Sequence, residues 1–397
     1  MRILNSLSDL NVSRILRLIW QEKRISRIEI AGVLKIDKST VTKIISELTR
    51  LGLVRETESG ESGPQGGRKP VYLEITGRYA CVGGIEINTE RMYCCIVDLC
   101  GQVLYEQLII IDPDSYELKG CLGFFKDGCD MLVAEAKKSD IPLAGIGVGL
   151  SGMIDAKTGC IVQSIPLMVF EPLNIIQKAK EFSSVPIFID NDARCCCYTE
   201  QMISDKSINA KNMMYVMTEF RPIQPVKDAP KNISVGLGLV FNGRIYHGAN
   251  SAAGEFRSIL WKNGSPTQFS TGTEHLDSLE NREIIEPMFK ELAQNIAFLV
   301  NTLTLDAVYV GGIEHKYADE LIKYIREATV YLWPYEWKKT TLITRAAISK
   351  RAVSYGAACM VLDKLFGIPE LNGTKQESTA LNDDLPSAYA FLTSLRS

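Results

Sequence analysis

The sequence predicts an α/β protein that begins with a winged helix-turn-helix. Residues 26–51 have the apolar spacing and capping residues of two helices joined by a tight turn. Residues 53–75 contain two strand-like segments around a Gly-rich loop. Beyond residue 79, strands alternate with helices and glycines follow the strands, which is typical of an α/β fold. With 397 residues, the chain is long enough for two or three compact units.

Composition excludes a membrane protein. Hydrophobic residues make up 46% of the chain, which is ample for a globular core. No run of about 18 apolar residues is present to span a bilayer. The first 16 residues are too polar for a signal peptide and contain no small-residue cleavage site. We therefore expect a cytoplasmic protein with no membrane partner.

Charge is distributed unevenly along the chain. Residues 1–80 contain 14 Lys and Arg against 9 Asp and Glu, whereas the remainder contains 30 against 38. A basic N-terminal module on an acidic body fits a polyanionic partner that binds at one end only. Chance fluctuation over 80 residues is the alternative explanation.

The eleven cysteines do not have the spacing of a metal site. They include the adjacent runs Cys94-Cys95 and Cys195-Cys196-Cys197, no C-x-x-C pair occurs, and the chain has only three histidines. We expect buried, reduced thiols and no bound metal.

Capping residues place three helices in the N-terminal module. Asn11 is the expected cap of the first helix. Ser26 is expected to cap the second, with Glu29 completing a capping box. Asp37 is expected to cap the third, which ends at Gly52.

The outward face of the third helix is the expected DNA-reading surface. Short hydroxyl side chains let a helix sit deep in the major groove, and lysines at the rim meet phosphates. The alternative is an ordinary three-helix bundle with a solvated polar face. The candidate DNA-binding residues here are Lys38, Ser39, Thr40, Thr42 and Lys43.

A wing is expected after the third helix. Residues 53–56 and 71–75 are strand-like and can pair as a hairpin. Arg68 and Lys69 follow the Gly-rich tip, from which an arginine can reach an A·T-rich minor groove. The alternative is an interdomain linker.

Six strand-bearing blocks form the body of the chain. Ligands in α/β folds bind at the carboxyl ends of the strands, where several of these blocks end in glycine or acidic residues. The blocks are residues 81–87, 91–110, 144–155, 185–200, 234–256 and 308–313.

The order of the motifs resembles the ROK family, which groups bacterial sugar repressors with sugar kinases. The resemblance rests on GGRKP (66–70), GIGVGLSGMID (145–155), the Asn191-Asp192 pair and the AGE triplet (253–255). It implies a two-lobed, actin-like (RNase H-like) sugar-kinase fold behind the winged helix-turn-helix. The expected domains are residues 1–76 (DNA-binding), 77–194 with a C-terminal helix at 380–397 (first lobe) and 195–379 (second lobe).

One departure from the family pattern argues against catalysis. ROK kinases carry an acidic residue followed two positions later by Gly-Gly-Thr, whose backbone amides hold the ATP phosphates. This chain reads Glu86-Ile87-Asn88-Thr89-Glu90-Arg91 instead, and Glu90 would repel phosphate. The family's catalytic aspartate corresponds to Asp192, which we expect to act only as a hydrogen-bond acceptor. No cofactor is expected.

A second departure concerns zinc. The family usually reads Gly-Glu-x-Gly-His followed by a cysteine run, whereas residues 254–258 read GEFRS and no cysteine lies between Cys197 and Cys359. The second sugar-contacting glutamate has only Glu274 and Glu280 as candidates, and Arg257 can bring a positive charge near the site.

The resemblance implies a sugar site between the lobes, because carboxylates and amides pair with adjacent hydroxyls. Asn191-Asp192 as an ordinary turn, and Glu255 as a helix-start carboxylate, are the alternatives. His247 and His275 are interpreted as surface or hydrogen-bonded histidines. The candidate sugar-binding residues are Ser151, Gly152, Asn191, Asp192 and Glu255.

Together these features indicate a sugar-responsive transcriptional regulator, a repressor of carbohydrate uptake or catabolism genes. Its expected partners are a two-fold operator DNA, a sugar or sugar derivative, and further copies of itself in a homodimer or a dimer of dimers. One alternative is a ROK sugar kinase with an accessory DNA-binding module. Another is a DNA-bound scaffold whose sugar site has decayed.

Overall fold

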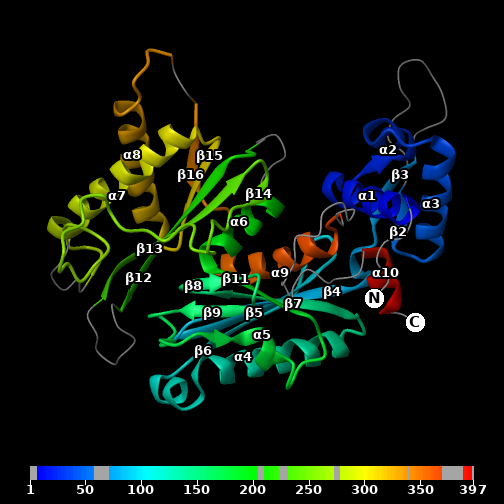
Figure 1. Cartoon of the computed structure of the whole chain (residues 1–397), viewed down its shortest axis with the longest axis horizontal. Coiled ribbons are helices and arrows are strands. Elements are labelled where there is room, and N and C mark those ends of the chain that lie inside the picture. Colours follow the sequence, from blue (N-terminus) through cyan, green and yellow to red (C-terminus); the bar gives the residue numbers. More distant parts are fainter. Residues whose placement is uncertain are drawn as a thin grey trace.

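The structure is a computed structural model. It describes residues 7–57, 71–203, 210–222, 231–271, 278–337, 340–368 and 388–395. A small N-terminal module lies at one end, beside two lobes that are each built on a five-stranded sheet (Figure 1). Arg68, Lys69, Glu274 and His275 lie outside the described residues.

The N-terminal module is a winged helix-turn-helix, as the sequence predicts. The wing strands pair antiparallel, and a third short strand, which was not predicted, pairs with the second of them. The elements are α1 (Leu7–Glu22), β1 (Ile25–Ser26), α2 (Arg27–Leu34), α3 (Lys38–Arg50), β2 (Val54–Thr57) and β3 (Tyr72–Ile75).

Two of the three predicted helix starts are confirmed. The Ser26 hydroxyl accepts from the Glu29 amide while the Glu29 carboxylate accepts from the Ser26 amide, which completes the capping box. The Asp37 carboxylate accepts from the Ser39 and Thr40 amides at the start of α3. The prediction for Asn11 was wrong: α1 already begins at Leu7, because apolar residues continue the helical period upstream of Asn11.

The first lobe is a mixed sheet in the order β11-β7-β4-β5-β6. An antiparallel meander, β4-β5-β6, is extended on its other side by the parallel strands β7 and β11. The elements are β4 (Cys81–Ile87), β5 (Arg91–Asp98), β6 (Val103–Ile110), α4 (Pro113–Lys138), β7 (Leu143–Leu150) and β11 (Ile187–Asn191). A side sheet and a short helix complete it: β8 (Met153–Asp155), β9 (Cys160–Gln163), β10 (Leu173–Asn174) and α5 (Ile175–Ala179).

The second lobe repeats this topology in the order β14-β13-β12-β15-β16. Its antiparallel strands are again followed by two parallel ones. Helices α7 and α8 pack together over a separate apolar core. The elements are β12 (Met213–Pro222), β13 (Lys231–Phe241), β14 (Arg244–Ile245), α7 (Arg282–Leu303), β15 (Ala307–Gly311), α8 (His315–Tyr331) and β16 (Leu342–Arg345).

Two helices connect these bodies. α6 (Asp192–Ile203) and α9 (Ala352–Leu365) pack closely on each other, and α9 also lies on β4 and β7. Gly84 and Gly147 of these strands, and Gly356 of α9, allow the close approach, because a Cβ at each would meet the backbone of the opposite element. Part of the glycine pattern in the strands therefore serves helix packing.

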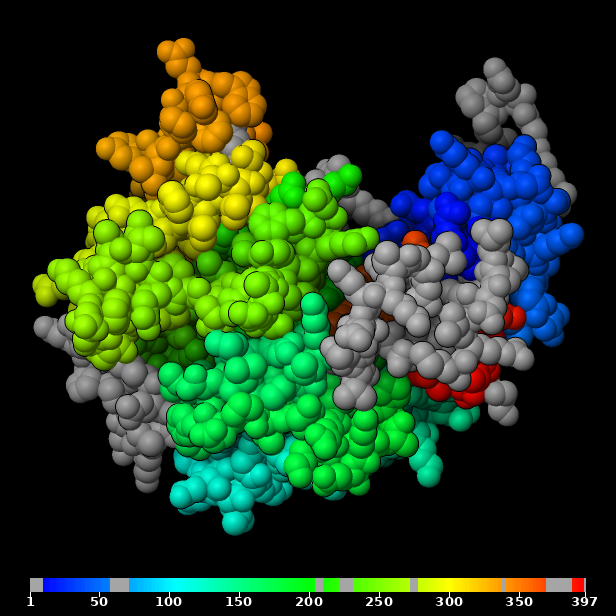
Figure 2. Space-filling model, in the orientation of Figure 1, coloured from blue at the N-terminus to red at the C-terminus, as the bar shows by residue number. Residues whose placement is uncertain are grey.

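A single apolar core joins the N-terminal module to the first lobe. It contains α1 residues such as Ile15 and Ile19, lobe residues such as Val82 and Val97, and the end of α9. The short helix α10 (Ala388–Ser394) adds Ala388 and Leu392 to the same core and contacts α1. Figure 2 shows the module (blue) projecting at one end, with α10 (red) beneath it.

The domain limits expected from the sequence remain predictions. α9 falls within the range 195–379 but packs on strands of the first sheet. No helix in the described part of the chain is long and apolar enough to cross a bilayer.

Candidate functional site

The outward face of α3 carries the candidate DNA-binding residues. Val41, Ile45 and Leu48 are buried against the rest of the module, and the opposite side of α3 is exposed among the described residues. Two hydroxyls already donate locally: Ser39 Oγ to Asp37 Oδ2 at 2.5 Å and Thr42 Oγ1 to the Lys38 carbonyl at 2.8 Å. Lys38, Ser39, Thr42 and Lys43 are exposed, and Thr40 is half-buried.

The first lobe brings four of the five candidate sugar-binding residues together. β7 and β11 are parallel neighbours, so their carboxyl ends deliver Ser151 and Asp192 to the same edge. Ser151 Oγ donates to Asp192 Oδ2 at 2.5 Å. Asn191 Nδ2 donates to the Gly152 carbonyl at 3.1 Å, while Asn191 Oδ1 accepts from the backbone amides that start α6. Asn191 therefore holds the turn in shape, and Asp192 is the residue that it presents.

Burial changes the acidity of Asp192. Burial raises its pKa to about 6, and Glu219 adds to the shift, while the Ser151 hydrogen bond and Arg221 oppose it. The carboxyl is thus mostly ionised at neutral pH and protonated below about pH 6. An ionised carboxylate accepts hydrogen bonds from sugar hydroxyls.

A buried arginine anchors the segment that leads to the fifth candidate, Glu255. Arg194 Nε binds Asp190 Oδ1 at 2.5 Å, and Nη1 donates to the carbonyls of Ser251 and Ala253. These contacts fix the segment that leads to Glu255, whose backbone pairs with Gly236 of β13. Glu255 itself is exposed.

His247 is the third member of a network with Arg194 and Asp190. Its Nε2 lies 2.9 Å from Asp190 Oδ2, which agrees with its interpretation as a hydrogen-bonded histidine. Burial acts to raise the pKa of Asp190, but the Arg194 guanidinium and His247 outweigh it and lower that pKa to about 2. Neither Arg194 nor Asp190 was among the predicted site residues, because an i,i+4 pair at a strand–helix junction has no distinctive sequence signal.

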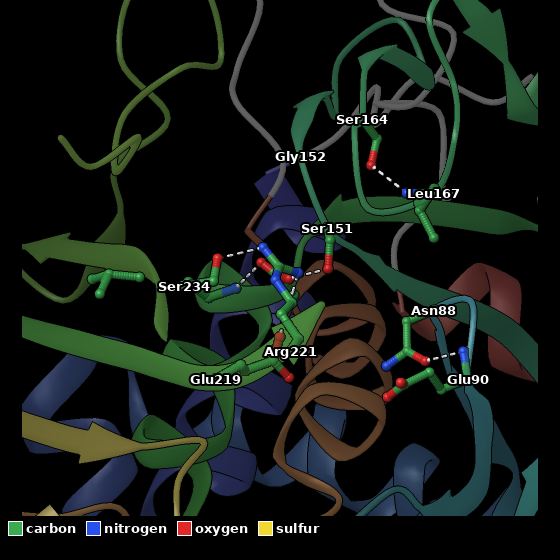
Figure 3. A network of polar contacts seen from close by, with 12 residues as sticks. Asn88, Glu90, Ser151, Gly152, Ser164, Leu167, Glu219, Arg221 and Ser234 are labelled. Carbon is green, nitrogen blue, oxygen red and sulfur yellow. Dashed lines mark hydrogen bonds and ion pairs between the residues drawn. The ribbon is translucent and has the colours of Figure 1, made fainter. Parts of the chain in front are cut away.

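A side chain accepts hydrogen bonds from two backbone amides of the turn between β4 and β5. Asn88 Oδ1 accepts from the Glu90 amide at 2.9 Å (Figure 3). It also accepts from the Arg91 amide at 2.8 Å. The turn therefore lacks the glycines expected in a kinase, and the Asn88 side chain accepts hydrogen bonds from its backbone amides instead. This geometry does not suit a nucleotide phosphate.

An ion pair crosses from the first lobe to the second at this turn. The Arg91 guanidinium lies 3.0 Å from Glu86 Oε1 and 3.3 Å from Glu219 Oε1 of β12. Burial raises the pKa of Glu86 to about 7, and Arg91 opposes this shift. Arg91 thus pairs with one acidic side chain from each lobe.

The second lobe contributes polar side chains of β12 and β13, and the region between them and Ser151 of the first lobe is named the cleft (Figure 3). Arg221 extends from β12 toward Ser151, with Glu219 and Ser234 beside it (Figure 3). Arg221 Nη2 donates to Ser234 Oγ at 2.5 Å, and Nη1 lies 3.5 Å from Glu219 Oε2. Sequence reasoning gave no role to either Arg221 or Glu219.

The segment that would carry zinc ligands in the family is held by hydrogen bonds. The buried Glu291 of α7 accepts from the Ser270 amide and hydroxyl, both at 2.8 Å, and from the Thr271 hydroxyl. Gln268 binds the backbone of Val235 and Phe256. Among the described residues, no group of three or more His, Cys, Asp or Glu side chains could hold a metal ion.

Two further residues that the sequence suggested for the site, Arg257 and Glu280, contact other parts of the second lobe. The Arg257 guanidinium stacks on the Trp261 ring at 4.3 Å. Glu280 pairs with Lys316 and with the Tyr317 hydroxyl on the outer helices. Glu280 is therefore not a sugar contact in this structure.

A continuous packed path leads from the cleft to the N-terminal module. α6 begins at Asp192 and packs along α9. At the far end of α9, Asp363 forms a 2.7 Å ion pair with Arg17 of α1, and Phe366 stacks on Trp20. The Trp20 indole also donates to the Leu99 carbonyl of the first lobe at 2.9 Å.

Comparison with known families agrees with the two-part architecture. Residues 82–266 match the ROK family, and residues 8–55 match the winged helix-turn-helix DNA-binding family. The chain is 27% identical over 261 residues to the xylose repressor of Staphylococcus xylosus, covering 64% of this chain and 62% of that one. It is 25% identical over 256 residues to the dual regulator NagC of Escherichia coli, covering 63% of this chain and 57% of that one. The chain thus matches about 60% of the length of these relatives.

Solved structures share the fold. A ROK family transcriptional regulator, a homologue of the E. coli MLC protein, superposes with a TM-score of 0.70 at 18% identity, covering 91% of this chain and 98% of that one. A ROK family glucokinase from Streptomyces griseus, in complex with glucose and AMPPNP, gives a TM-score of 0.51 at 14% identity, covering 71% and 99%. These likenesses establish the two-lobed fold with its N-terminal module.

Proposed function

Since this chain is a ROK family protein with an N-terminal winged helix-turn-helix, we propose that it is a sugar-responsive transcriptional regulator. Specifically, it represses genes for carbohydrate uptake or catabolism. The outward face of α3 binds the operator, and a sugar binds between the lobes at Ser151, Asp192 and Glu255. The names of the relatives, xylose repressor and NagC, support this proposal.

The packed path from the cleft to the module is the observation that carries the proposal. A sugar at Asp192 touches the first residue of α6, which packs on α9. α9 in turn ends against α1 through Asp363 and Phe366. A change in lobe closure therefore reaches the position of the DNA-binding module through contiguous packing, and operator affinity changes with it.

The proposal includes the assembly and the location of the protein. A homodimer places two recognition helices on a two-fold operator, which matches the symmetry of the protein to that of the DNA. The protein acts in the cytoplasm and uses neither a cofactor nor a metal.

Sugar phosphorylation is not part of the proposal. Asn88 accepts hydrogen bonds from two amides of the turn that would hold ATP in a kinase, and Arg91 is held by Glu86 and Glu219. Without a phosphoryl donor, Asp192 acts as a hydrogen-bond acceptor and not as a base.

Sequencing of genomic DNA fragments retained by the purified protein at physiological salt tests the proposal. We expect enrichment of a two-fold site near genes for a sugar transporter or a glycosidase. The regulator hypothesis would be replaced by the kinase hypothesis if two results were obtained. No DNA would be enriched with or without a panel of sugars, and the protein would produce ADP from ATP and a hexose at more than about 1 per second.

A further inference from the structure

The second-lobe wall of the cleft presents a charged side chain to the proposed sugar site. Arg221 lies near the end of β12 and pairs with Asn232 of β13, and the same register sets Glu219 opposite Ser234. Its guanidinium is fixed by both of these side chains, at 3.5 and 2.5 Å. The Arg221 side chain is 28% exposed, so it is held in place and still accessible from the cleft.

Arg221 faces the same groups that a sugar would use. Its charge opposes the rise in the pKa of Asp192 on the first lobe, and it does the same at Glu255. A guanidinium has five N–H donors, and the contacts to Ser234 and Glu219 engage two of its nitrogens. A hydroxyl-bearing ligand can therefore donate to Asp192 and accept from Arg221 at the same time, which joins the two lobes through the ligand.

The overall charge of the cleft limits which ligands fit. Four acidic side chains lie in this region: Glu86, Asp192, Glu219 and Glu255. Burial raises the pKa of Glu86 to about 7, so this carboxyl is only partly ionised at neutral pH. Two guanidiniums balance them in part, and that of Arg91 is already bound to Glu86 and Glu219. The Arg194 guanidinium adds no net positive charge, because it forms a buried ion pair with the Asp190 carboxylate.

This excess of carboxylates disfavours an anionic ligand. A phosphate adds about two negative charges at neutral pH and needs several donors that are not already paired. An uncharged sugar meets no such repulsion, and an amine-bearing sugar is attracted by Glu219 and Glu255.

We propose that Arg221 is the specificity-determining residue that the second lobe contributes to the effector site, and that the effector is an uncharged or amine-bearing sugar. Sugar phosphates and sugar acids are excluded. The inference rests on the proposed effector site and names the ligand class of that site.

Calorimetric titration of the full-length protein tests the inference. The probes are D-xylose, glucosamine, and two matched pairs: glucose with glucose 6-phosphate, and N-acetylglucosamine with its 6-phosphate. We expect at least one unphosphorylated sugar to bind, and any phosphorylated partner to bind at least tenfold more weakly than its parent. Arg221→Gln should weaken the binding of the sugar at least tenfold, and Arg221→Lys should weaken it less. Arg244→Gln, at an exposed arginine on β14 of the same lobe, should leave it unchanged.

The possible failures are distinguishable. If a 6-phosphate binds more tightly than its parent and Asp192→Asn abolishes both, the ligand class is wrong while the effector site stands. If the uncharged sugar binds equally well to folded Arg221→Gln, the assignment of Arg221 is wrong. If no probe binds the wild-type protein, the proposed effector site itself is overturned and the inference with it. The ratio of the affinities for a sugar and its 6-phosphate is measured on the wild-type protein, so it remains decisive even if a variant does not fold.

Discussion

The indole ring of Trp20 stacks on the ring of Phe366, with 5.1 Å between the ring centroids and 15° between the planes. Trp20 lies on α1 of the DNA-binding module, and Phe366 directly follows α9. The stack therefore connects the module to the helix that packs along α6, at whose first residue the proposed sugar site begins. The stack is the contact through which we propose that sugar binding affects the DNA-binding module.

Replacing Trp20 should disconnect the module from the lobes. Trp20→Ala removes the stack and the hydrogen bond to the Leu99 carbonyl, so we expect a loss of about 2–4 kcal/mol in the free energy of unfolding. The ratio of operator affinities with and without sugar should move toward 1. Trp20→Phe should keep most of the response, and Trp337→Ala, at a tryptophan that is 68% exposed, should keep all of it. Fluorescence anisotropy on operator DNA measures the ratio, and an unchanged ratio in folded Trp20→Ala would contradict the path.

Replacing Lys43 should weaken operator binding through the phosphates. Lys43 is exposed on the outward face of α3, where a lysine at the rim of the major groove meets the DNA backbone. Lys43→Ala should lower affinity uniformly across operator variants and reduce the slope of log K against log salt by about 0.9. Lys157→Ala, an exposed lysine on the first lobe, serves as the control. An unaltered salt slope in Lys43→Ala would remove this residue from the DNA interface.

Sugar binding should depend on pH through Asp192. Burial raises the pKa of Asp192 to about 6, so a rise from pH 5 to pH 7.5 ionises the carboxyl and restores its capacity to accept hydrogen bonds. We expect the affinity for sugar to increase over this range and to level off above about pH 7. Calorimetric titrations at several pH values measure the profile. The weak binding that remains in Asp192→Asn should show a much smaller pH dependence, and identical profiles for both proteins would contradict the assignment.

The same pKa shift should reduce the stability of the unliganded protein at higher pH. The ordinary pKa of an aspartate is 3.8, and a value raised to about 6 in the folded state means that the fold binds the proton more tightly. The stabilising contribution is complete below about pH 3.8 and is lost as pH rises through about 6. Denaturant unfolding should show a loss of up to about 3 kcal/mol that Asp192→Asn lacks. A parallel pH dependence in the variant would show that Asp192 is not the source.

The segment after Glu255 should depend on Glu291 and not on a metal. Glu291→Ala leaves the Ser270 and Thr271 donors without their acceptor, so we expect a loss of about 1–3 kcal/mol in stability. Thermal unfolding should be unchanged by a chelator in the wild-type protein. Glu283→Ala, at an exposed carboxylate in the first turn of the same helix, is the matched control. A large drop in melting temperature on chelation would reveal a structural metal.

The local features of this chain were predictable from its sequence. The capping box at Ser26 and Glu29, the cap at Asp37 and the paired wing strands depend on residues close together in the chain, and each is confirmed. The start of α1 was misplaced because the apolar helical period continues upstream of Asn11 to Leu7.

Long-range contacts in the cleft were not predictable in the same way. Arg91 and Glu219 are 128 residues apart, and only the meeting of the two lobes makes them partners. Arg221 and Ser234 become neighbours through the register of β12 and β13. The family resemblance pointed to the first-lobe residues and to Glu255 of the second lobe, because its motifs contain them, whereas Glu219 and Arg221 emerged only from the structure.

The measurement that tests the central claim most directly is an operator titration with wild-type protein and Asp192→Asn, each with and without the sugar that binds. We expect the sugar to change the operator affinity of the wild-type protein at least tenfold, whereas Asp192→Asn should bind the operator normally and ignore the sugar. If the sugar changed the operator affinity of both proteins equally, or of neither, the cleft would not control the DNA-binding module and the account would be contradicted.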